Sequence, residues 1–178
     1  MRIVGGLLRG RRFTAPSSIP ARPTTDFAKE ALFNILAHQI HWPDVNALDL
    51  FSGIGSISIE MVSRGARQVT SIDKHPKAVQ WLSKTGQELN LSALYPIRSD
   101  AIHWLERVNQ KFDFVFADPP YDYDDYDKVI ELVLKSALQP DGLFVLEHRQ
   151  SGSFANHSNF VEDRTYGEVR FSFFRLNA

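Results

Sequence analysis

Short apolar runs alternate with longer amphipathic segments along most of the chain, from about residue 45 onward. The apolar runs have the length of buried strands, and the segments between them have helical spacing of apolar residues. Strands are predicted at 46–51, 68–72, 94–98, 112–117 and 142–147, and helices near 54–64, 76–89, 100–109 and 124–138. This alternation predicts an α/β fold, a mostly parallel, doubly wound sheet with helices on both faces.

The C-terminal part has a different pattern. Val169, Phe171 and Phe173 alternate with polar residues, and Tyr166-Gly167 separates this run from another over residues 160–164. Period-two alternation on both sides of a glycine turn is typical of a hairpin. We therefore expect the sheet to end in an antiparallel C-terminal hairpin.

The N-terminal part is also distinct. Residues 1–13 interleave apolar residues and arginines with glycines, which predicts a small basic β-hairpin arm, and the proline-rich residues 14–23 predict a loop. A helix should begin near Thr24 or Thr25, where a threonine can cap its free N–H groups. The chain is thus predicted to comprise an arm at 1–23 and an α/β domain at 24–178.

Composition narrows the class of protein. A chain of 178 residues with 43% hydrophobic and 23% charged residues fits one folded domain. It contains no cysteine, which excludes disulfides and thiolate catalysis, and its six histidines are scattered, so no metal site is expected. It has no apolar stretch long enough to cross a membrane, and we expect a cytoplasmic protein.

The charge is unevenly distributed. The net charge is −1, but residues 1–25 carry five arginines and no acid, so the remainder has 15 basic and 21 acidic residues. A basic arm on an acidic body suits contact with phosphates, although a solvated tail would have the same composition. The arginines concerned are Arg2, Arg9, Arg11, Arg12 and Arg22.

A glycine-containing loop follows the first predicted strand and resembles the cofactor loop of S-adenosylmethionine methyltransferases. Ligands in doubly wound sheets bind beyond the carboxyl ends of the strands. Glycines there let the backbone approach a ligand, and the next helix offers free N–H groups to a carboxylate. The candidate cofactor residues in this loop are Asp49, Phe51, Ser52, Gly53 and Gly55.

Acidic residues after the next two strands extend this prediction. Asp73, followed by Lys74, is placed to accept hydrogen bonds from ribose hydroxyls, and Asp100 with the Ala101 N–H is placed for adenine. Either aspartate could instead cap the following helix. A nicotinamide-binding domain competes, but its fingerprint requires glycine where this chain has Ser58.

A second motif, Asp118-Pro119-Pro120-Tyr121, follows the fourth strand. The Asp118 carboxylate and the Pro119 carbonyl can each accept one N–H of an exocyclic amino group, and Tyr121 can stack on the base. Asp-Pro-Pro also occurs in ordinary turns, and Tyr121 could simply fill the edge of the core. Both motifs lie at carboxyl ends of strands, so together they predict an amino-group methyltransferase acting on a nucleobase.

Several segments resemble one family, the bacterial 16S rRNA guanine-N2 methyltransferases. They are the opening residues 1–11, Asp49-Leu50-Phe51-Ser52-Gly53, Asp118-Pro119-Pro120-Tyr121, Tyr166-Gly167 and, most specifically, residues 22–36. The resemblance implies a Rossmann-like class I methyltransferase fold and S-adenosylmethionine-dependent transfer to the N2 amino group of a guanine in the small ribosomal subunit. It also implies that Arg22 and Thr24 lie near cofactor or RNA and that the arm contacts rRNA or ribosomal protein.

Two other functions fit the same residues. Asp118-Pro119-Pro120-Tyr121 also suits adenine-N6 chemistry on RNA or DNA, and a catalytically silent ribosome-assembly factor could keep the same fold. Phe27 stands where relatives often carry a basic residue, and Glu147-His148-Arg149, after the fifth strand, is a further candidate for RNA contact. We expect the protein to act as a monomer.

Overall fold

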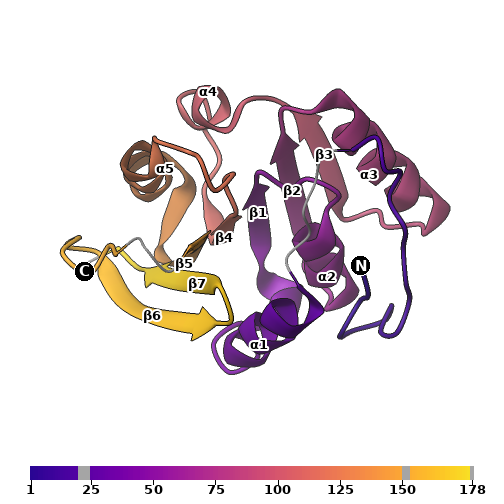
Figure 1. Cartoon of the computed structure of the whole chain (residues 1–178), viewed down its shortest axis with the longest axis horizontal. Helices are drawn as coiled ribbons and strands as arrows, with labels where there is room; N and C mark the ends of the chain where they lie inside the picture. Colours follow the sequence, from indigo (N-terminus) through magenta and orange to yellow (C-terminus); the bar gives the residue numbers. More distant parts are fainter. Residues whose placement is uncertain (20–24, 150–152, 177–178) are drawn as a thin grey trace.

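The protein is built on one seven-stranded sheet (Figure 1). The computed structural model describes residues 1–19, 25–149 and 153–176. The strand order is β3-β2-β1-β4-β5-β7-β6. Neighbours among β1 to β5 are parallel, and β7 is antiparallel to both β5 and β6. The strands are β1 Asn46–Leu50, β2 Gln68–Asp73, β3 Leu94–Arg98, β4 Phe112–Ala117, β5 Leu138–Arg149, β6 Phe160–Tyr166 and β7 Val169–Phe174.

Helices cover both faces of this sheet. α1, α2 and α3 pack on one face, and α4 and α5 pack on the other. Alternate strand residues enter the two cores: Ala47 belongs to the first and Leu48 to the second. The predicted doubly wound sheet and C-terminal hairpin are therefore confirmed. The helices are α1 Asp26–Leu36, α2 Ser56–Ser63, α3 Pro76–Glu88, α4 Ala101–Leu105 and α5 Tyr126–Leu132.

Some element boundaries differ from the prediction. The helix expected near 100–109 ends at Leu105. The helix expected near 124–138 is α-helical only to Leu132 and continues as a π-helical turn, Val133–Ala137. β5 starts at Leu138, earlier than predicted, and pairs there with Phe112 across an irregularity in the register. A 3-10 turn, Trp42–Asp44, precedes β1. Local patterns do not report these ends, because packing against the neighbouring elements determines them.

The N-terminal arm folds back on itself and packs against α1 and α2. It forms a single antiparallel bridge, Arg2 to Arg12, rather than a continuous ladder. Ile3 is fully buried, and the Leu7 N–H donates to the Ser63 carbonyl of α2 at 2.7 Å. The arm is thus anchored to the α/β unit by both apolar contact and hydrogen bonds.

The sheet reverses its strand order between β1 and β4. β2 and β3 lie to one side of β1, and β4 and β5 lie to the other. Crossover connections leave the sheet in opposite directions at such a point, which opens a crevice at the carboxyl ends of the two strands. Within the described part of the chain, no helix is both long enough and apolar enough to span a bilayer.

Candidate functional site

Hydrogen bonds join the loops that follow β4 and β1 to the ends of the neighbouring strands. The Asp118 N–H donates to the Leu50 carbonyl at 3.3 Å, and the Ser52 N–H donates to the Ile72 carbonyl at 2.9 Å. Each bond connects the end of one strand to the loop after its neighbour. The double-proline loop and the glycine loop therefore lie side by side at the crevice, as the sequence predicted.

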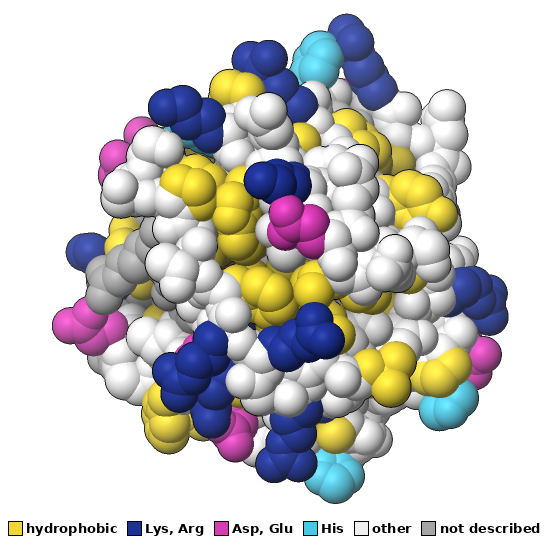
Figure 2. Space-filling view, turned by 90° about the vertical axis from the view of Figure 1, so that its right-hand side faces the viewer, with side chains coloured by type: hydrophobic (Ala, Val, Ile, Leu, Met, Phe, Trp, Pro, Cys, Tyr) yellow, Lys and Arg dark blue, Asp and Glu magenta, His cyan; other side chains and the backbone are white. Residues whose placement is uncertain are grey.

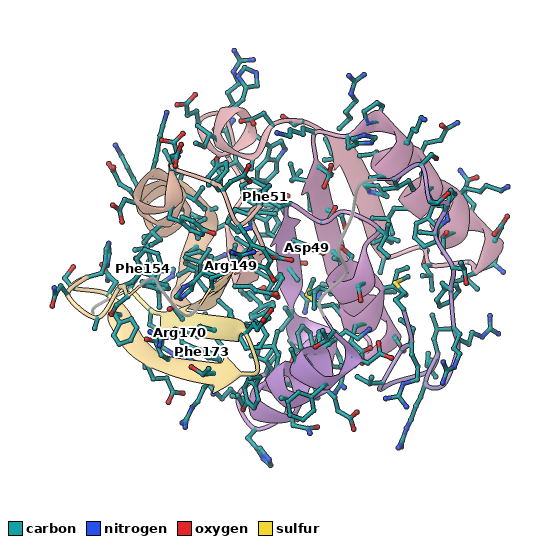
Figure 3. The ribbon with its side chains drawn as sticks, in the orientation of Figure 1. Asp49, Phe51, Arg149, Phe154, Arg170 and Phe173 are labelled. Carbon is teal, nitrogen blue, oxygen red and sulfur yellow. The ribbon has the colours of Figure 1, made fainter. Side chains whose placement is uncertain are left out.

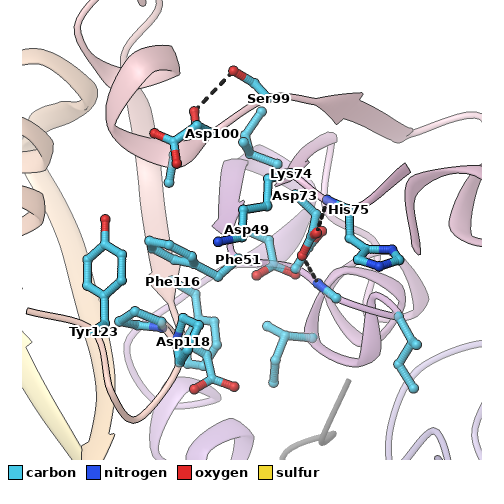
Figure 4. A pocket seen from close by; sticks show the side chains of 18 of the residues that line it. Asp49, Phe51, Asp73, Lys74, His75, Ser99, Asp100, Phe116, Asp118 and Tyr123 are labelled. Atoms are coloured by element: carbon cyan, nitrogen blue, oxygen red, sulfur yellow. Dashed lines mark hydrogen bonds between the residues drawn. The ribbon is translucent and has the colours of Figure 1, made fainter. Parts of the chain in front are cut away.

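A cavity of about 400 Å³ opens at this place (Figure 4). This volume lies in the usual range for small-molecule sites. Every predicted cofactor residue except Gly55 lines it, together with the whole of Asp118-Pro119-Pro120-Tyr121. Its lining consists of Asp49, Phe51, Ser52, Gly53, Ile54, Ser56, Ile57, Ile72, Asp73, Lys74, His75, Ser99, Asp100, Ala101, Phe116, Asp118, Pro119, Pro120, Tyr121 and Tyr123.

Gly55 has a different position from the other glycine of the loop. Its φ is +74°, and a Cβ at this residue would lie 2.3 Å from Leu82 Cδ1 of α3. The Leu82 side chain would have to shift to relieve this contact, and a positive φ is in any case strained for a residue with a Cβ. Gly55 thus lets the backbone turn tightly into α2 close to Leu82 of α3.

Backbone N–H groups organise the carboxylates at one end of the cavity. Asp73 Oδ2 accepts from Gly53 N at 2.8 Å, and its Oδ1 accepts from His75 N at 2.7 Å (Figure 4). Asp100 caps α4 by accepting from His103 N at 3.1 Å. Asp100 therefore caps the following helix, which was the alternative role considered for it. Asp73 instead joins the glycine loop to the residue before α3. Since a carboxylate has about four acceptor positions, both residues keep capacity for a ligand.

Asp49 lies deeper in the cavity, on β1. Its carboxylate is almost fully buried and accepts a short hydrogen bond from Ser58 Oγ of α2. Ser58 Oγ in turn accepts from Ser71 Oγ of β2 at 2.7 Å. Burial raises the pKa of Asp49 to about 7, and the charges of Asp73 and Glu147 add to this increase while Ser58 opposes it. A cation that binds near such a carboxyl group lowers its pKa and favours its ionised form.

Sequence reasoning missed the polar residues behind Asp49. The sequence marked Ser58 only as a departure from the dinucleotide fingerprint, and it gave no role to Ser71. Both are fully buried. The sequence gives little signal for either serine, because β2 and α2 contain other polar residues as well. Their burial is what requires a hydrogen-bonding partner.

Asp118 is held in a similarly dry environment. Burial raises its pKa well above the ordinary value, and the charges of Glu147 and Asp49 raise it further. Glu147 lies on β5, next to β4, and only 2% of its surface is exposed. Glu147 is thus an acidic neighbour of the site rather than a residue that faces RNA, contrary to the sequence interpretation.

The loop after Asp118 has a defined shape. Tyr123 N donates to the Pro120 carbonyl at 2.9 Å, and the Tyr126 hydroxyl donates to the same carbonyl at 3.4 Å. The Tyr123 ring makes an edge-to-face contact with Phe51, with ring centroids 5.2 Å apart. Phe51 has a φ of +61°, an uncommon conformation for a bulky residue. The two loops therefore also meet through aromatic packing.

The predicted RNA-binding arginines divide into three groups. Arg2 is half-buried and forms ion pairs with Asp26 at 3.5 Å and Glu30 at 3.4 Å, so the fold uses its guanidinium. Arg9, Arg11 and Arg12 are exposed on the arm. Figure 2 views the side of the molecule with the arm and α3, on which Lys and Arg side chains form several separate groups. Arg22 and Thr24 lie outside the described residues.

Lys29 is a buried cation that the sequence analysis did not single out. Its ammonium donates to the Arg2 carbonyl at 2.5 Å and to Ser56 Oγ at 3.0 Å. Burial lowers the pKa of Lys29, and the charges of Glu60 and Asp26 oppose that decrease. Since Ser56 lines the cavity, this lysine links the arm to the start of α2.

His148 and Arg149 have different environments. His148 is buried, and its Nε2 lies 2.7 Å from Ser172 Oγ on β7, so the RNA contact inferred for it is wrong. Arg149 is exposed, and its guanidinium carbon lies 4.3 Å from the centre of the Tyr121 ring. Of the three candidates after the fifth strand, Arg149 is thus the exposed one, and it contacts Tyr121, which lines the cavity.

Comparison with known proteins agrees with this geometry. The family profile described as "Conserved hypothetical protein 95" matches residues 1–175. The "Ribosomal RNA small subunit methyltransferase D" of Haemophilus influenzae is 31% identical over 98% of this chain and 93% of its own. Among solved structures, a hypothetical protein of Thermus thermophilus is 27% identical with a TM-score of 0.86, and each chain is covered to 99%.

A more distant structure shares the fold. It is the Thermus thermophilus 16S rRNA N2 G1207 methyltransferase RsmC in complex with AdoMet and guanosine. RsmC is 20% identical to this chain, with a TM-score of 0.73 over 89% of this chain and 45% of its own. The family profile and the whole-length relatives confirm the resemblance found in the sequence. The chain belongs to the family described as conserved hypothetical protein 95, which contains the ribosomal RNA small subunit methyltransferase D proteins.

Proposed function

We propose that this protein transfers a methyl group from S-adenosylmethionine to the N2 amino group of a guanine in 16S rRNA of the small ribosomal subunit. One observation carries the proposal: the glycine loop and the Asp118-Pro119-Pro120-Tyr121 loop line the same cavity. Such a cavity can hold a methyl donor and a flat amine against each other. The names of the whole-length relatives support rRNA as the substrate class.

The residues at the glycine-loop end suit the donor. Asp73 can accept from ribose hydroxyls, Asp100 and the Ala101 N–H can bind adenine, and Ile54 and Ile72 supply apolar walls. Asp49 can pair with a cationic centre. S-adenosylmethionine, when bound, supplies an activated methyl group on a positively charged sulfur. The RsmC neighbour, which was solved with AdoMet and guanosine, supports this assignment at the level of the fold.

The residues at the other end suit the amine. The Asp118 carboxylate would accept one N–H of guanine N2, and the Pro119 carbonyl would accept the other. These two hydrogen bonds hold the nitrogen lone pair toward the donor, and orientation of this kind contributes roughly 7–11 kcal/mol in favourable systems. Because burial raises the pKa of Asp118, this carboxylate can also take the proton that the methylated amine releases.

RNA would reach the site with its target base turned outward. A stacked or paired base cannot enter such a cavity, so the nucleotide must be extruded or already unpaired. Tyr121 would stack on the base. We assign residues 1–23 to an RNA-contacting arm and 24–178 to the catalytic domain, and we place the protein in the cytoplasm as a monomer that acts on the small subunit or its precursor.

A direct experiment tests this function. The protein is incubated with methyl-labelled S-adenosylmethionine and small subunits from cells that lack the modification, and the rRNA is digested to nucleosides. We expect label in N2-methylguanosine. Label in N6-methyladenosine would support the adenine alternative, and binding without transfer would support a silent assembly factor.

A further inference from the structure

The Tyr121 ring, expected to stack on the target base, is covered by a cation. Arg149, the last residue of β5, places its guanidinium carbon 4.3 Å from the ring centre (Figure 3 labels Arg149). β5 runs parallel to β4, and Leu146 pairs with Ala117, the residue before Asp118. The parallel register therefore brings Arg149 to the same rim as the double-proline loop.

Acidic groups lie on the same loop and the same strand as this contact. Asp118 and Asp122 flank the Pro119-Pro120-Tyr121 segment, and Glu147 is two residues before Arg149 on β5; Asp118 and Glu147 are buried and Asp122 is exposed. Burial raises the pKa of the Tyr126 phenol; among the nearby charges Asp118 adds to the increase and Arg149 reduces it. Asp118 and Arg149 thus act on one hydroxyl group from close range.

This arrangement creates a problem for an incoming nucleotide. An extruded base brings its own backbone phosphate to the mouth of the cavity, where carboxylates would repel it. A cation at the mouth removes the repulsion. Arginine suits this place because its planar guanidinium can stack on an aromatic ring and can also bind phosphate through two N–H groups.

We propose that Arg149 is a positioning residue for the target nucleotide. Its guanidinium stacks on the face of the Tyr121 ring while the site is free of RNA. When the target base enters and takes this face, the guanidinium moves away and binds the backbone phosphate of the extruded nucleotide. This inference rests on the proposed function. It adds a specific phosphate contact beside the catalytic loop, separate from the arm.

Two substitutions separate this role from a structural one. Arg149→Gln removes the charge, whereas Arg149→Lys keeps the charge and loses the planar group. For Arg149→Gln we expect KM for small subunits to rise about tenfold, with kcat changed less than about threefold. The slope of log affinity against log salt should fall by about 0.7, as expected when one phosphate contact to single-stranded RNA is lost. Arg149→Lys should retain the slope and recover most of the KM.

Arg67 supplies the matched control. It precedes β2, at the end of the sheet opposite the cavity, and it is 60% exposed with an ion pair to Asp44 at 3.5 Å. Arg67→Gln and Arg67→Lys should leave KM, kcat and the salt slope at wild-type values. Calorimetric titration of S-adenosylmethionine into each variant verifies that the cofactor end is intact.

The outcomes distinguish the two proposals. If the wild-type protein labels no rRNA, both proposals are overturned. If it labels rRNA and Arg149→Gln behaves like Arg67→Gln, only the role of Arg149 is overturned. A loss of kcat that is equal in both Arg149 variants, with an unchanged salt slope, would mean that Arg149 merely supports Tyr121 and would also overturn it.

Discussion

The two ends of the cavity hold their carboxylates in different ways. At the glycine-loop end, Asp73 and Asp100 accept hydrogen bonds from backbone N–H groups that belong to loops and helix starts. In the deeper part of the cavity, Asp49 on β1 and Asp118 at the start of the double-proline loop are buried close to Glu147, and burial raises the pKa of each. Local backbone geometry organises the first pair of carboxylates, and the exclusion of water organises the second pair.

This difference indicates that the two pairs of carboxylates have different roles, one in recognition and one in the reaction. Carboxylates fixed by the backbone suit recognition of neutral hydroxyl and amino groups, since the acceptor atoms are already in place. Carboxylates with raised pKa values suit the reacting groups, because a cation or an amine that enters a dry site changes their ionisation. The following predictions test whether the two ends can be perturbed separately.

The largest effect is expected at Asp118. Asp118→Asn keeps the size of the side chain but weakens it as an acceptor and removes it as a base, so we expect turnover to fall about 10²–10³-fold. Affinity for S-adenosylmethionine should change less than about threefold. Asp124→Asn, on the exposed part of the same loop, is the control. A normal rate in Asp118→Asn would remove this residue from the mechanism.

Asp49 should couple cofactor binding to pH. Its pKa of about 7 means that the ionised fraction of the free protein rises about eightfold between pH 6 and pH 7.5, and affinity for a cationic ligand should rise with it. Asp49→Asn should bind about 10-fold to 100-fold more weakly at pH 7.5. Titration calorimetry at several pH values measures both effects, and Asp49→Asn shows how much of the pH dependence comes from the ligand itself. If the affinity of the wild type and that of Asp49→Asn changed equally with pH, this role of Asp49 would be contradicted.

The same carboxyl group should lower stability at high pH. Its pKa in the folded protein, about 7, exceeds the ordinary value of 3.8. Its contribution to stability is therefore fully present below about pH 4 and is lost as pH rises through 7. Without cofactor at pH 8, Asp49→Asn should be more stable than the wild type by about 1–3 kcal/mol. Urea unfolding at pH 5 and pH 8 checks this, and a variant that loses stability at pH 8 would refute it.

The smallest effect is expected on the arm. Replacing Arg9, Arg11 and Arg12 together by glutamine should reduce the slope of log affinity against log salt by about 2, as for three contacts to single-stranded RNA. Binding to small subunits across a salt series measures this. Stability should change little because the three side chains are exposed. Deleting the arm is a poorer test, since Ile3 is part of the core. An unchanged slope would leave the arm as a structural flap.

Much of the fold could be predicted because it depends on local patterns. The apolar runs marked β1 to β5, and alternation at Val169, Phe171 and Phe173 marked the edge hairpin. The family assignment was also available from the printed residues and is confirmed by the profile match. Helix ends such as Leu105 were not predictable, since contacts with distant elements decide where a helix stops.

The residues of the site, like the elements of the fold, were predictable from the sequence only in part. By itself, the sequence determined which loops follow the parallel strands, and hence that Gly53, Asp73 and Asp118 share one rim, because all parallel strands end on one side of a sheet. Only the tertiary structure decided that Ser58 and Ser71 support Asp49, that Glu147 lies beside Asp118, and that Arg149 covers Tyr121. These contacts join residues from different strands and helices, so they depend on strand register and side-chain packing rather than on any pattern along the chain.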